Sequence, residues 1–138
     1  MAEAIGLAPS IIALLNLTVT VVHYIENVSS GSKYRERMLS ELNHIQHILN
    51  QLRDQTQTLN ENNVPTEALS WLALPNGPLD QFQVTLERLL SKLKPVVGFK
   101  KFGKALVWPF QTEEIEDILS TVERQKSLFI LVLQSDQT

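Results

Sequence analysis

The sequence predicts an all-α fold: a helical bundle of four long helices plus one short helix, with no sheet. Two observations lead to this prediction. Apolar residues recur at spacings of three and four along several long segments, which is the period of amphipathic bundle helices. Turn-forming clusters separate these segments, such as Ser-Ser-Gly at 29–31 and Asn-Gly-Pro at 76–78.

The composition is that of one globular domain spanning residues 1–138. Of the 138 residues 43% are apolar and 20% are charged, and this length can bury a core without disulfides or metals. A net charge of -3 gives no bulk attraction to nucleic acid. The absence of cysteine excludes disulfides and thiol chemistry and is compatible with the cytosol. Glu3 stands where a secretory signal would carry a basic residue, so we expect no cleaved signal.

The segment 4–22 contains no charged side chain. We expect a helix that starts near Pro9 and runs to about Val28. Its weakly polar positions fall on one narrow stripe: Ala13, Asn16, Thr20, His23 and Asn27. The apolar positions are Ile5, Leu7, Ile11, Ile12, Leu14, Leu15, Leu17, Val19, Val21 and Val22. Such a helix is either buried in a bundle or able to enter a bilayer, which about 20 apolar residues can cross. The residues alone leave both meanings open.

The next predicted helix begins at Ser32 and ends in the Asn-rich stretch before Pro65. Its apolar seam has heptad spacing: Met38, Leu42, Ile45, Leu49, Leu52, Thr56 and Leu59. His44 and His47 lie one turn apart, with Glu41 as the nearest third ligand, so a metal site is conceivable. We favour an exposed helix face, because both histidines point away from the seam.

Three further helices are predicted. A short one at 65–74 has Trp71 as its anchor against the bundle. The next starts at the 76–78 turn, ends at Pro95 and carries Leu79, Phe82, Leu86, Leu89, Leu90 and Leu93 on one face. The last follows Thr112 and buries Ile115, Ile118, Leu119, Val122, Phe129 and Val132. Because residues 128–133 are apolar all round, we expect that part to be deeply packed.

The stretch between the last two helices is irregular and basic. No acidic residue lies between Arg88 and Thr112, whereas half of the basic residues of the protein do. Either these cations are solvated beside a helix C-terminus, or they form a patch for anionic lipid. The patch would comprise Lys92, Lys94, Lys100, Lys101 and Lys104. We expect the rings of Trp108 and Phe110 to be buried and to hold this stretch against the bundle.

No motif in the sequence indicates an enzyme or a cofactor site. The chain has no glycine-rich phosphate loop, no GxSxG, no HExxH and no cysteine. The adjacent acids Glu113 and Glu114 are typical of a helix start. We therefore expect a protein without catalytic residues and without a bound cofactor.

Several segments resemble a known fungal family. They are AEAIGLAPSIIALL at the start, Trp71-Leu72, NGPLDQFQVTLERLLSKL, GKALVWPF and ILSTVERQKSLFILVLQSD. Together they look like the HeLo-like N-terminal domain of fungal STAND receptors, which are NLR-like NACHT and ankyrin proteins. The resemblance covers about residues 2–136. Its most specific part is the family motif: Trp108, Pro109, Phe110, Glu123, Arg124 and Lys126.

This resemblance implies a HeLo-like bundle excised from a longer cytoplasmic receptor, whose other domains hold it inactive. When the receptor is triggered, such a domain forms a homo-oligomer, moves to the plasma membrane and perturbs membrane lipid in programmed cell death. The N-terminal apolar helix is the membrane-active element of the family. The alternative is a non-lytic bundle that mediates assembly by protein interaction, with the first helix staying in the core.

Overall fold

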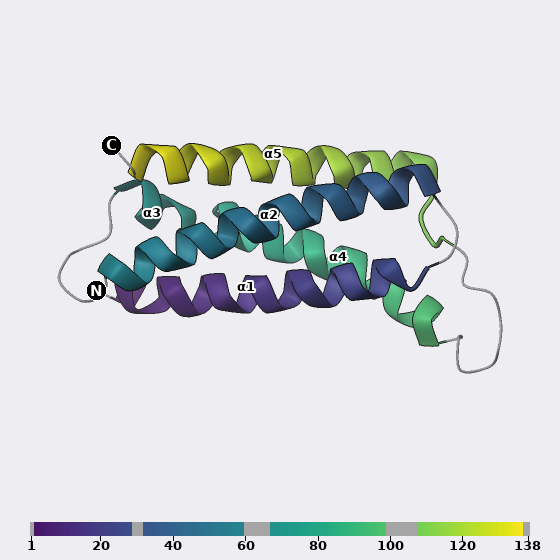
Figure 1. Cartoon of the computed structure of the whole chain (residues 1–138), viewed down its shortest axis with the longest axis horizontal. Helices are drawn as coiled ribbons and strands as arrows, with labels where there is room; N and C mark the ends of the chain where they lie inside the picture. The colour runs from purple at the N-terminus through teal and green to yellow at the C-terminus, as the bar shows by residue number, and fades with distance from the viewer. Residues whose placement is uncertain (1, 29–31, 60–66, 99–107, 137–138) are drawn as a thin grey trace.

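The computed structural model describes residues 2–28, 32–59, 67–98 and 108–136 (Figure 1). Its helices are α1 (Ala2–Glu26), α2 (Ser32–Leu59), α3 (Glu67–Leu72), α4 (Pro78–Gly98) and α5 (Thr112–Asp136). The described residues contain no strand, so the prediction of an all-α bundle of four long helices and a short one is confirmed.

Each of the four long helices packs against two of the others. Helix α1 packs against α2 and α4, and α5 packs against the same two helices from the opposite corner. The described backbones of α1 and α5 do not approach each other as closely, so these two helices lie diagonally opposite across the core. The short α3 lies at the end of the bundle where α1 begins and α5 ends (Figure 1).

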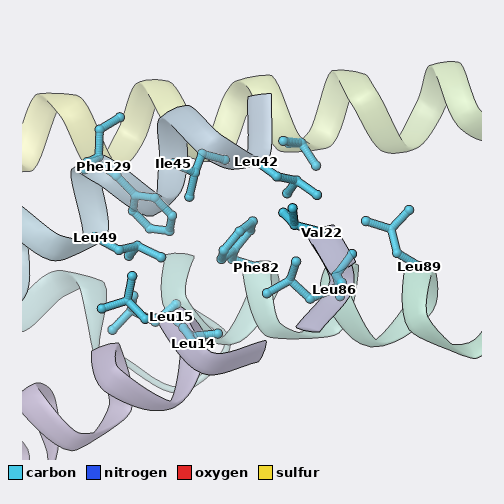
Figure 2. Packing of buried hydrophobic residues seen from close by; sticks show 14 of the residues in the cluster. Leu14, Leu15, Val22, Leu42, Ile45, Leu49, Phe82, Leu86, Leu89 and Phe129 are labelled. Atoms are coloured by element: carbon cyan, nitrogen blue, oxygen red, sulfur yellow. The ribbon is translucent and has the colours of Figure 1, made fainter. Parts of the chain in front are cut away.

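A single hydrophobic core fills the space between the helices (Figure 2). The rings of Phe82 on α4 and Phe129 on α5 meet edge to face at its centre, with centroids 5.6 Å apart. The predicted seam of α2 lies in the core at Met38, Leu42, Ile45, Leu49, Leu52 and Thr56, and the side chain of Leu59 lies outside the described side chains. The predicted faces of α4 and α5 are buried except Leu90, which is half-buried. The three-four spacing thus located most of the core correctly.

Two predicted helix boundaries are wrong because prolines are tolerated inside the helices. Helix α1 begins at Ala2, and Pro9 lies within it. The ring of Pro9 removes one helical hydrogen bond, but Leu7 in the preceding turn is only 1% exposed, and its burial offsets that loss. Helix α4 likewise continues past Pro95 and ends at Gly98, so the proline lies within its last turn.

Two predictions of burial are also wrong. Trp71 does not anchor α3, since it is 41% exposed, and the fully buried Leu69 and Leu72 attach this helix instead. Within 128–133, Leu131 is 57% exposed. Because α5 occupies a corner of the bundle, one side of even its most apolar stretch faces solvent.

Candidate functional site

The candidate membrane-active helix α1 buries one face and exposes an uncharged one. Of the predicted membrane-active residues, Leu7, Ile11, Leu14, Leu15, Val21 and Val22 are buried and Leu17 is half-buried. Ile12, expected in the core, is 37% exposed, and Val19 is 48% exposed. The side chain of Ile5 lies outside the described side chains. Of the predicted polar stripe, Ala13, Asn16, Thr20 and His23 are exposed and Asn27 is half-buried.

This helix also has the length and composition of a membrane span. Leu7–Glu26 has a mean hydropathy of 1.6, and it is the one helical segment in the described ranges that passes this test. In the folded bundle 39% of the most apolar 18-residue window of this segment is buried. The central helix of a soluble protein passes the same test, so the span criterion alone does not separate the two meanings of α1.

Polar side chains join the other long helices to one another. Between α2 and α5, Tyr34 donates to Glu116 (2.7 Å), Arg37 pairs with Glu123 (2.9 Å) and Lys126 pairs with Glu41 (2.6 Å). Between α4 and α5, Arg88 pairs with Asp117 (3.2 Å) and Lys92 with Glu114 (2.9 Å). No ion pair joins the described side chains of α1 to any neighbouring helix.

Arg35, near the start of α2, donates hydrogen bonds to the end of α1. Its Nε donates to the carbonyl of Ile25 (3.2 Å) and its Nη2 to the carbonyl of Glu26 (3.1 Å). These carbonyls belong to the last turn of α1, where no further N–H group of the helix is available to donate to them. No pattern in the sequence predicts this contact, because Arg35 is there one of several charged residues near the start of the second predicted helix.

The structure describes all six residues of the motif on which the predicted resemblance rests. Phe110 is buried, as predicted, and its ring centroid lies 5.1 Å from that of Trp108. Trp108 is half-buried, so the prediction of full burial is wrong for this ring; Pro109 is half-buried as well. Glu123 and Lys126 make the ion pairs to α2 described above, and Arg124 is exposed.

The predicted anionic-lipid patch is only partly described. Lys100, Lys101 and Lys104 lie outside the described residues. Lys94 is exposed, whereas Lys92 faces Glu114 from the first turn of α5. The basic stretch that begins at Arg88 contains no acidic residue in sequence, but the fold brings Glu114 and Asp117 of α5 close to it. For Lys92, the ion pair with Glu114 favours a cation on the bundle surface over a free contact with anionic lipid.

The described residues contain no group of three or more His, Asp or Glu side chains that could hold a metal. His44 and His47 are both exposed. Glu41, the nearest third ligand in sequence, is engaged by Lys126. The metal hypothesis therefore gains no support from this part of the chain.

The chain has no significant match among protein-family models, curated proteins or solved structures. The resemblance to fungal HeLo-like domains therefore stays a prediction that rests on the sequence segments themselves.

Proposed function

We propose that this chain is the cell-death effector domain of a fungal NLR-like receptor, which oligomerises and perturbs the plasma membrane through α1. The receptor context comes from the sequence resemblance. The observation that carries the membrane role is the attachment of α1. A helix of span length and apolarity is joined to the bundle by apolar contacts and by Arg35, without an ion pair among its described side chains.

Apolar attachment is the kind that lipid can replace. Separation of α1 exposes its buried face at roughly 25 cal/mol per Å², so release needs a sink such as hydrocarbon or a neighbouring protomer. Hydrocarbon restores the burial of Ile11 or Val21, whereas it could not restore an ion pair. The core surface left on α2 and α4 would in turn need a second protomer, which accounts for a homo-oligomer in the active state.

The two threonines of α1 donate hydrogen bonds within the helix itself. The hydroxyl of Thr18 donates to the carbonyl of Leu14 (2.7 Å) and that of Thr20 to the carbonyl of Asn16 (3.0 Å). Both bonds lie within the helix and would move with it into lipid. The hydroxyl groups therefore add little to the cost of transfer, because they would not enter hydrocarbon unpaired.

Two matched substitutions test this proposal. Val19→Lys places a charge on the exposed face in the middle of the span, and Val84→Lys places the same charge on α4, where the valine is 63% exposed. Both variants should fold like the wild type, since exposed substitutions change stability by about 0.5 kcal/mol or less. A central lysine costs about 3 kcal/mol of insertion free energy, so Val19→Lys should reduce the inserted population about 100-fold.

The measurement is dye release from liposomes with and without anionic lipid. We expect leakage by the wild type and by Val84→Lys, and little by Val19→Lys. A folded Val19→Lys variant that leaks like the wild type would show that α1 does not insert. A wild type that leaves both kinds of liposome intact would overturn the lytic function itself.

One observation favours the non-lytic alternative. Ile11, Val21 and Ile25 are fully buried, as expected of a permanent core helix. In that case the domain would act as an assembly bundle within its receptor and α1 would never leave. Self-association in solution together with intact liposomes at the same protein concentration would support this second function.

A further inference from the structure

We propose that Arg35 pins the C-terminal end of α1 to α2, so that α1 separates from the bundle beginning at its N-terminal end. The guanidinium acts as a pivot while the preceding turns come away. This proposal deepens the proposed function, on which it rests for the fate of the separated helix. The polarity of separation is itself a property of the folded chain in water.

All three nitrogen atoms of the Arg35 guanidinium have an acceptor. Two donate to the carbonyls of Ile25 and Glu26, and Nη1 lies 2.6 Å from Oε1 of Glu36. Glu36 therefore holds the flat group in the orientation that reaches α1. The Arg35 side chain is only 22% exposed, so water competes weakly for these bonds. A cation at this end also opposes the negative end of the helix dipole.

The last turn of α1 is closed tightly at the same place. The backbone N–H of Val28 donates to the carbonyl of Ile25 (3.1 Å) and that of Asn27 to the carbonyl of Tyr24 (3.2 Å). The carbonyl of Ile25 thus accepts two hydrogen bonds, one from the backbone N–H of Val28 and one from the Arg35 side chain. Val28, two residues after the end of α1, is 1% exposed and adds an apolar anchor to the polar one.

The side chains of α1 described from Leu7 onward show no comparable attachment before the last turns of the helix. Pro9 lacks an N–H group and leaves one helical bond unmade. Among the described side chains from Leu7 to Thr20, the hydrogen bonds present are those of Thr18 and Thr20, and both stay within α1. The polar links between the described side chains of the bundle and α1 therefore lie at the C-terminal end of the helix, whereas apolar burial extends from Leu7 to Ile25.

Hydrogen–deuterium exchange of the full chain in buffer, without lipid, tests this polarity. We expect wild-type amides at 11–16 to exchange faster than those at 22–26. Arg35→Gln should raise exchange at 22–26 about tenfold relative to the α5 amides, because two hydrogen bonds from a cation are lost. Arg37→Gln is the matched control, because Arg37 lies two residues after Arg35 but forms an ion pair with α5. This variant should leave the exchange rate of the amides at 22–26 unchanged.

Arg35→Lys provides a second variant should the glutamine variant fold poorly, since one ammonium cannot reproduce the fork on two carbonyls. It should raise exchange at 22–26 as well. Unchanged exchange at 22–26 in a folded Arg35 variant, or wild-type exchange at 22–26 as fast as at 11–16, would overturn the pivot. Dye release by the wild type separates the two proposals: intact liposomes with polarised exchange reject the lytic function and keep the pivot.

Discussion

Lys126 of α5 and Glu41 of α2 form an ion pair with 2.6 Å between Nζ and Oε2, and their side chains are only 21% and 19% exposed. The same two helices are also joined by Arg37 and Glu123, at 2.9 Å, where the side chains are 48% and 45% exposed. One helix interface therefore holds a shielded ion pair and a solvated one. This contrast allows the effect of burial on an ion pair to be measured within a single interface.

We predict that Lys126→Met lowers the free energy of unfolding by about 1.5–3 kcal/mol, because the carboxylate of Glu41 would remain in a shielded place without its partner. Arg37→Gln should cost about 0–1 kcal/mol, since water screens that pair. Urea denaturation of both variants measures the difference. Equal costs for the two substitutions would mean that burial does not set the strength of these pairs.

The neighbouring rings of Trp108 and Phe110 give a second prediction. Phe110→Ala should lower the free energy of unfolding by about 3–5 kcal/mol, because a buried ring leaves a cavity. Trp108→Ala should cost less, about 1–2 kcal/mol, since its half-buried ring already meets water on one side. Thermal denaturation ranks the two variants. A larger effect at Trp108 would contradict the burial described for these residues.

The sequence predicted the core well because helical packing repeats locally. The spacing of four between Met38 and Leu42 of α2 predicts that both lie on one buried face, and the same holds for Phe82 and Leu86 of α4. The anchor of α3 was misjudged because Trp71 is large. A helix of six residues presents one side to the core, and leucines occupy that side.

The candidate site was less predictable because its polar contacts join distant parts of the chain. Tyr34 meets Glu116, a partner 82 positions away, and no spacing rule connects them. The acid-free window around Lys92 suggested a free basic patch, yet α5 supplies Glu114 across the bundle. Arg35 contacts carbonyl groups, which carry no side-chain signature in any sequence. The apolarity of α1 was visible in the sequence, whereas its mode of attachment was not.

The turn before α4 gives a third prediction. A Cβ atom at Gly77 would lie 2.7 Å from the carbonyl oxygen of Leu74 and 3.2 Å from that of Trp71. Because backbone atoms cannot move aside easily, Gly77→Ala should destabilise the protein by about 1–3 kcal/mol. Asn76→Gly is the control. Asn76 has a φ of 59°, which glycine adopts freely, so the change should stay within about 1 kcal/mol. Similar losses in both variants would argue against the steric reason.

The hydrogen bond from Tyr34 to Glu116 predicts a pH dependence. This bond raises the pKa of Tyr34 above its ordinary value of 10.0; desolvation and the negative charge of Glu116 act in the same direction, and Arg37 acts against them. A raised pKa means that the folded protein favours the neutral phenol. The stabilisation is therefore complete below the unfolded pKa and is lost as the pH rises through the folded pKa.

We accordingly expect the α2–α5 interface to weaken in alkaline solution above about pH 10, where tyrosine ionises. The chain has two tyrosines, so Tyr24→Phe leaves Tyr34 as the only one to titrate by ultraviolet absorbance. In that background Glu116→Gln should lower the pKa of Tyr34, because it removes the charged acceptor. Tyr34→Phe should remove this part of the alkaline loss of stability in a urea series. If Tyr34 titrates at the same pH with and without Glu116, the hydrogen bond does not link the two helices in solution.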